Sequence, residues 1–192
     1  MFRKLFSTSL VLLTLLVGER VSAQEASPPK IPAQTITSDL EMGIYIDAID
    51  SSDGIFSTPG TVKLPQCTRR RFSLYGLNEK NVEAYKKELI RLGVRSVSLP
   101  LNTTSAELKT YVDAGLLTNV TSLRCYWCND LTDITSLAKL PNLTSLDLNR
   151  CFNLSDITPL AKLQKLTYLN FSNCAWLTDL TPLAKLKNLT YS

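Results

Sequence analysis

The last third of the chain repeats itself, and this repeat constrains the fold more than any other feature. Three copies of one unit begin at Leu131, Leu154 and Leu177, a spacing of 23 residues. They read LTDITSLAKLPNLTSLDLNRCFN, LSDITPLAKLQKLTYLNFSNCAW and LTDLTPLAKLKNLTYS. A fixed period of this length predicts a solenoid, because one such unit buries its apolar face only by stacking on its neighbours.

Each unit contains a short apolar strand segment of the form LxxLxL, which is typical of leucine-rich repeats. We therefore predict an α/β leucine-rich repeat solenoid over residues 94–192. Its parallel β-sheet forms the concave face, short helical turns form the convex face, and a helical cap precedes the repeats. The strand segments begin at Val94, Val120, Leu143, Leu166 and Leu189. The fifth segment is cut short at Ser192, which predicts that the array is C-terminally incomplete.

The repeats resemble those of a known family. The segment DITPLAKL, residues 156–163, followed by the strand KLTYL resembles the repeats of bacterial internalin-type leucine-rich repeat proteins. Cys151 and Cys174 stand where those repeats carry Asn, and this variation is similar to the cysteine-containing subclass of leucine-rich repeats. The resemblance covers roughly residues 94–192, and it implies the solenoid fold and a bacterial source.

The N-terminus has the pattern of a secretory signal peptide. Arg3 and Lys4 are followed by a mostly apolar stretch, and the segment Val21-Ser22-Ala23 supplies the small residues of a cleavage site. The strongest apolar run, residues 10–17, is shorter than the ~20 residues that span a bilayer. The sequence therefore predicts cleavage after Ala23, no membrane span, and a protein that is secreted or held in the periplasm or at the cell surface.

Between the signal peptide and the repeats, two further regions are predicted. Residues 24–38 are rich in Pro, Ser, Gln and Ala and read as a linker. Residues 39–93 read as an N-terminal region with a small β element, a loose hairpin around residues 44–56, and a capping helix that ends at Gly93. Thr104 and Glu107 form a capping box that predicts a second helix, running to Gly115.

The charge balance argues against a nucleic-acid partner. The chain has a formal net charge of +4, and removal of residues 1–23 lowers it to +2. A charge this small is not the basic footprint of a nucleic-acid-binding protein. The expected partner is a protein or a cell-surface ligand.

Residues between the inward-facing leucines point to the solvent side of the sheet, because strand side chains alternate. We predict that they bind the ligand on the concave face, as in other solenoids. The predicted ligand-binding residues are Ser122, Arg124, Tyr126, Trp127, Asp147, Asn149, Arg150, Tyr168, Asn170 and Ser172. An alternative function is structural, with an open C-terminal repeat edge that stacks on further repeats or on another chain.

No catalytic residue, metal ligand or cofactor is predicted, so we do not expect an enzyme. The chain has no His, and the CxxC motif of Cys125 and Cys128 lacks the second ligand pair that zinc requires. One repeat apart, Cys128, Cys151 and Cys174 should stack as a column of free, buried thiols. The aspartates that share one repeat position are expected to cap the convex turns rather than to act as an acid–base pair; they are Asp133, Asp156 and Asp179.

Overall fold

The computed structural model describes residues 32–48, 54–64 and 67–190. The predicted signal peptide and the first part of the predicted linker lie outside these residues. In chain order the elements are β1 (Gln34–Ser38), β2 (Gly43–Ala48), β3 (Gly54–Ser57), β4 (Gly60–Leu64), β5 (Cys67–Ser73), α2 (Val82–Arg91), β6 (Ser96–Ser98), α3 (Ser105–Asp113), β7 (Ser122–Arg124), η1 (Thr135–Lys139), β8 (Ser145–Asp147), η2 (Thr158–Lys162), β9 (Tyr168–Asn170) and η3 (Thr181–Lys185).

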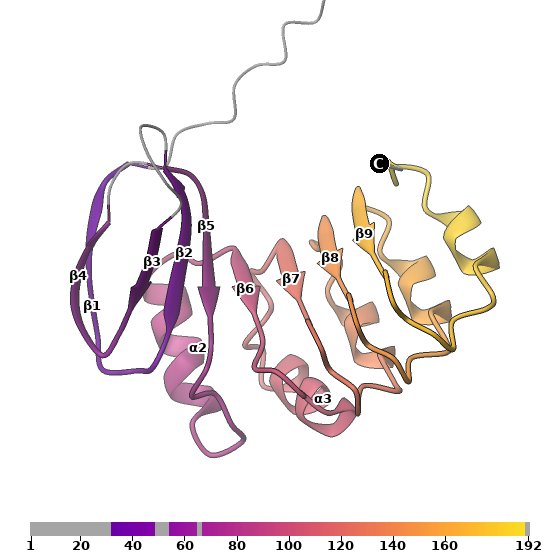
Figure 1. Ribbon diagram of the computed structural model, residues 1–192, viewed down its shortest axis with the longest axis horizontal. Coiled ribbons are helices and arrows are strands. Elements are labelled where there is room, and N and C mark those ends of the chain that lie inside the picture. The colour runs from indigo at the N-terminus through magenta and orange to yellow at the C-terminus, as the bar shows by residue number, and fades with distance from the viewer. Residues whose placement is uncertain (1–31, 49–53, 65–66, 191–192) are drawn as a thin grey trace, which may run out of the picture.

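The strands of the repeats lie in one curved sheet with the helices behind it (Figure 1). The strand order is β3-β2-β5-β6-β7-β8-β9, and every pair from β5 to β9 is parallel. Equivalent leucines of successive repeats lie side by side on neighbouring strands, since Leu123 pairs with Leu146 and Leu146 with Leu169. The predicted solenoid, with its parallel sheet on the concave side and helical turns on the convex side, is confirmed.

The N-terminal region differs from the prediction in two ways. Strand β1 occupies the last residues of the predicted linker, where Ile36 is buried and pairs with Val62 of β4. The three consecutive β-branched residues Thr35, Ile36 and Thr37 favour this strand. The repeat strand β6 is bordered by β5 rather than by a helix, so the sheet continues into the N-terminal hairpin of β2 and β3. The predicted helical N-terminal cap is therefore not confirmed, and α2 lies behind the sheet instead (Figure 1).

Two helix signals in the sequence are confirmed. At α3, the Thr104 hydroxyl accepts a hydrogen bond from the Glu107 N–H at 3.2 Å, and the Glu107 carboxylate accepts one from the Thr104 N–H at 2.8 Å. This reciprocal pair satisfies two donors that the first turn of a helix otherwise leaves free. Gly93 follows α2 with φ +63°, a conformation that glycine adopts without strain.

Stacking between repeats buries the apolar core and joins the backbones. Leu123 is 1% exposed and Leu146 is fully buried, together with the other inward-facing leucines of their repeats. A column of threonines adds a second connection. Thr144 donates both its N–H, at 2.8 Å, and its hydroxyl, at 3.0 Å, to the Thr121 carbonyl, and Thr167 bonds to Thr144 in the same way. Each repeat is therefore fastened to the one before it at the start of its strand.

The aspartates at the repeat position before each 3₁₀ helix act as caps, as predicted. A carboxylate oxygen of Asp133 accepts the Thr135 N–H at 2.7 Å, and Asp156 and Asp179 do the same at 2.7 and 2.9 Å. In each case the threonine that follows two residues later donates hydrogen bonds to the carboxylate, and these lower the pKa of all three carboxyl groups. These aspartates therefore stabilise the convex turns.

Candidate functional site

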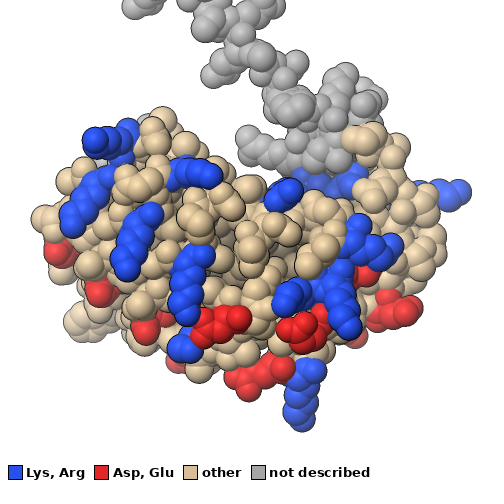
Figure 2. Space-filling model, turned by 180° about the vertical axis from the view of Figure 1, so that it is seen from behind, with Lys and Arg blue, Asp and Glu red and all other residues tan. Residues whose placement is uncertain are grey.

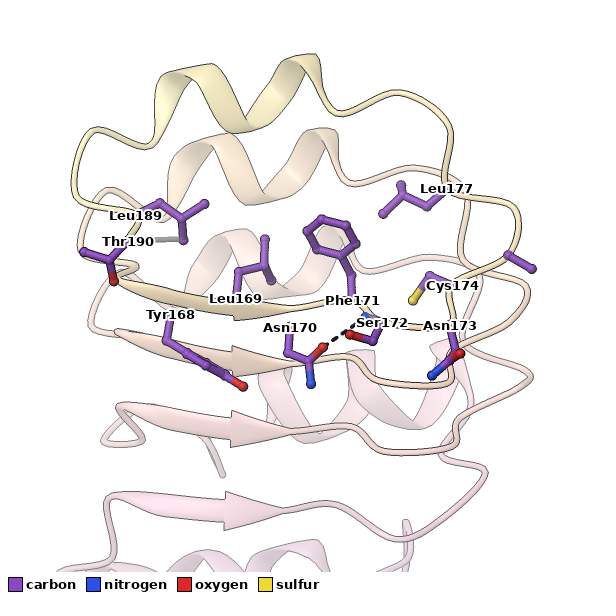
Figure 3. A pocket seen from close by; sticks show the side chains of 11 residues that line it. Tyr168, Leu169, Asn170, Phe171, Ser172, Asn173, Cys174, Leu177, Leu189 and Thr190 are labelled. Atoms are coloured by element: carbon purple, nitrogen blue, oxygen red, sulfur yellow. Dashed lines mark hydrogen bonds between the residues drawn. The ribbon is translucent and has the colours of Figure 1, made fainter. Parts of the chain in front are cut away.

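The concave face is formed by the alternate side chains of β7, β8 and β9. Figure 3 shows this alternation on β9, where Tyr168 and Asn170 lie on the opposite side of the strand from Leu169 and Phe171. Ser122 and Arg124 occupy the matching places on β7, and Asp147 on β8. Figure 3 also shows Ser172, just after β9, beside Asn170, whose side-chain oxygen accepts the Ser172 N–H at 3.0 Å.

Where the strands leave the sheet, four residues share a left-handed backbone conformation. Asn102, Trp127, Arg150 and Asn173 have φ angles of 59°, 58°, 61° and 62°. Such angles are uncommon for residues other than glycine; asparagine adopts them most readily, and a bulky side chain does so at a cost. We call these four residues the left-handed column. Trp127 and Arg150 therefore occupy positions where the same chain twice uses asparagine.

The left-handed column corrects the register of the first repeat. The sequence spacing places Asn102 level with Cys128, but the conformation places Asn102 level with Trp127. The next residue, Thr103, is 2% exposed and follows Asn102 as the buried Cys128 follows Trp127, so it occupies the first place of the buried column. One extra residue between Leu99 and Asn102 accounts for the shift, and the strand pattern alone does not reveal it.

Trp127 and Arg150 form a cluster with Tyr126 at the strand exits. The Arg150 guanidinium carbon lies 4.5 Å from the centre of the Trp127 ring and 5.9 Å from that of Tyr126. The two aromatic rings meet edge to face, with centres 5.8 Å apart and planes at 88°. Both distances from the cation are within the range of cation–π attraction. Trp127 is 41% exposed, so the cluster presents an aromatic surface to solvent.

Three of the predicted ligand-binding residues bond to one another across the sheet. The Arg124 Nε lies 2.9 Å from an Asp147 carboxylate oxygen, and the Asn170 amide donates to the other at 3.1 Å. That second oxygen also accepts the Asn149 N–H at 3.0 Å. Asp147 is only 8% exposed, because its neighbours cover it. Its carboxylate is therefore engaged within the sheet.

The cysteines lie in the core, as predicted. Cys125, Cys128, Cys151 and Cys174 are free and buried. The Cys151 thiol donates to the Cys125 carbonyl at 3.1 Å, and the Cys174 thiol donates to the Leu148 carbonyl at 3.3 Å. Burial raises the pKa of Cys125 and of Cys174, so both stay protonated at neutral pH. These four thiols therefore pack and hydrogen-bond as core residues.

Within residues 32–48, 54–64 and 67–190, no group of three or more His, Cys, Asp or Glu side chains is arranged to hold a metal ion. Among the described helices, none combines the length and apolar character that crossing a membrane requires. The concave sheet with its strand exits is the candidate site that the sequence and the geometry share.

A match to a family model agrees with this class of fold. A family model for leucine-rich repeats, described as two copies, matches residues 118–162. The chain therefore carries leucine-rich repeats, the basis of a protein-interaction module. Among solved structures, an internalin from Listeria monocytogenes is similar, with 24% sequence identity and a TM-score of 0.43. The match covers 62% of this chain and 39% of the internalin chain. The search of curated proteins returned no match.

Proposed function

We propose that this protein is an exported binding module that holds a protein or cell-surface ligand on its concave face and at its strand exits. The export step rests on the N-terminal signal pattern of residues 1–23. The binding role rests on the leucine-rich repeats, whose extended concave sheet is the usual binding surface of a solenoid.

The observation that carries the proposal is the cluster of Tyr126, Trp127 and Arg150. Tyr, Trp and Arg are the side chains most often found at the centre of protein interfaces. Two of the three are held in a left-handed conformation that favours asparagine. Backbone strain of this kind persists where the surrounding structure enforces it, and it concentrates at functional sites. The remaining predicted residues, such as Ser122, Asn149 and Tyr168, line the sheet beside the cluster.

The test is loss of ligand binding when the exposed aromatic side chains are removed. Biotinylated full-length protein is applied to an array of purified surface proteins and glycans, and each hit is measured with the variant that carries Tyr126, Trp127 and Tyr168 changed to Ala. Binding should weaken at least tenfold, since each anchor contributes more than about 1 kcal/mol. The matched control changes Lys162 of η2 and Lys185 of η3, on the convex side, to Ala and should bind normally. Unchanged binding by the triple variant would refute the concave-face proposal.

A second candidate function is assembly through the face beyond β9. Leu169 and Phe171 are only partly buried, whereas Leu146 and Leu148, their equivalents on the preceding repeat, are fully buried. These side chains and Leu189 line an open groove of about 640 Å³ (Figure 3). Under this alternative, the groove packs against another repeat, either of the same chain or of a second copy. Sedimentation of the full-length protein decides, because a strict monomer at all concentrations would count against association of copies.

A further inference from the structure

The guanidinium of Arg150 lacks the hydrogen-bond acceptor that three other arginines of the helices and repeats have. Arg91 pairs with Glu88, Arg95 donates to the Asn119 carbonyl, and Arg124 pairs with Asp147. Arg150 is half-buried, and its guanidinium has no hydrogen-bond acceptor or carboxylate partner anywhere in the described part of the chain. A guanidinium carries five N–H donors in a fixed plane, so all five remain available here.

The aromatic residues fix the orientation of this guanidinium. Trp127 lies under it at 4.5 Å and Tyr126 at 5.9 Å, while the Arg150 N–H bonds to the Ser172 carbonyl at 2.9 Å. This cation–π contact holds the guanidinium beside the rings and uses none of its N–H groups as hydrogen-bond donors. An arginine held in this way loses less conformational freedom when it binds a planar group, so its fork is arranged before the ligand arrives.

We propose that Arg150 binds a carboxylate of an acidic peptide segment, an aspartate or glutamate side chain of the partner protein. The two carboxylate oxygens accept parallel hydrogen bonds from the edge of the guanidinium, and the neighbouring apolar part of the ligand lies on Trp127 and Tyr126. This inference rests on the proposed function and deepens it, because it specifies the chemistry of the ligand at one position.

Charge and number of donors favour a carboxylate over a phosphate. A phosphate group on a peptide carries a charge of about −1.5 to −2 at neutral pH, which one guanidinium does not balance. On strands β6 to β9 the arginine is Arg124, which already bonds to Asp147, and that pair is neutral. One unpaired guanidinium matches the single charge and the planar, two-oxygen geometry of a carboxylate.

The test uses a displayed library of random peptides with the full-length protein as bait. Peptides are selected on the wild type, and those that the triple aromatic variant fails to bind are taken as ligands of the concave site. The selected pool should be enriched in Asp and Glu. Replacing the acidic residue of a selected peptide by its amide should weaken binding about ten- to a hundredfold, the effect of one charge-assisted hydrogen-bonded pair.

Variants of the protein give the reciprocal measurement. Arg150→Asn places at this position the residue found at Asn102 and Asn173, so its fold is retained, and it should bind the acidic and amide peptides equally. Arg150→Lys keeps the charge but loses the planar fork, and it should bind the acidic peptide with intermediate affinity. Lys162→Gln removes the same charge from the convex side and should leave the preference intact.

The outcomes separate the two proposals. Peptides that need the aromatic residues but show no acidic preference, or whose preference survives Arg150→Asn, overturn the carboxylate inference and leave the proposed function standing. A selection that yields only peptides still bound by the triple aromatic variant contradicts both. Enrichment of phosphorylated over carboxylate peptides in a parallel library overturns the choice of ligand chemistry.

Discussion

Replacing Asp147 by Ala should reduce stability rather than ligand binding alone. The carboxylate bonds to the Arg124 side chain at 2.9 Å, the Asn170 amide at 3.1 Å and the Asn149 N–H at 3.0 Å. The ion pair contributes about 0.5–1 kcal/mol, because the Arg124 side chain is 38% exposed and solvent screens it. The two amide donors add about 1 kcal/mol each when they lose their acceptor. We expect the free energy of unfolding to fall by about 2–3 kcal/mol.

The assay is urea unfolding followed by circular dichroism, with a double-mutant cycle. Asp147→Ala, Arg124→Ala and the double variant should give a coupling energy of about 0.5–1 kcal/mol for the pair. Asp130→Ala removes an exposed carboxylate from the loop after β7 and, as the control, should change stability by less than about 0.5 kcal/mol. A loss below about 0.5 kcal/mol for Asp147→Ala, or a coupling energy of zero, would refute the view that this carboxylate holds three repeats together.

Three further outcomes are expected. Trp127→Asn should leave the free energy of unfolding within about 1 kcal/mol of wild type, because asparagine adopts the left-handed backbone at less cost and this gain offsets the lost cation–π contact. A loss above about 2 kcal/mol in urea unfolding would contradict this. Leu146→Ala should lower the free energy of unfolding by about 2–5 kcal/mol, and Leu169→Ala by less than half as much, because Leu169 is only partly buried. Equal losses would show that β9 is covered in solution. Hydrogen bonds from two lysines lower the pKa of Asp113 from 3.8 to about 2. The ionised Asp113 carboxylate stabilises the folded state fully above pH ~4, and this stabilisation disappears as the pH falls through ~2. The urea midpoints of the wild type and Asp113→Asn should therefore converge in that interval.

The repeat region could be predicted from the sequence because its signals are local and periodic. Leucines at fixed spacing define the sheet, and a capping box such as Thr104 and Glu107 defines a helix start within four residues. The N-terminal strands could not be predicted in the same way. The pairing of Ile36 with Val62 joins segments far apart in the chain, and no short-range pattern specifies it.

The concave site was predictable in position but not in detail. Alternation in a strand places Tyr168 and Asp147 on the solvent side, and the structure agrees. Alternation does not say which of these side chains are engaged by neighbours, and Asp147 is covered while Trp127 is exposed. The left-handed column was missed because asparagine is its only sequence signal, and Trp127 and Arg150 conceal that signal.

The continuity of the sheet from β3 to β9 has a consequence for how the molecule opens. Strand β6 is flanked by β5 on one side and β7 on the other, whereas β9 is the last strand in the order and its Leu169 is only partly buried. Local opening is easiest where few apolar contacts resist it, so amide protons of β9 should exchange with solvent faster than those of β6 and β7. Exchange rates should then fall from β9 through β8 to β7, and Tyr126 and Trp127, which follow β7, lie at the slowly exchanging end of that series.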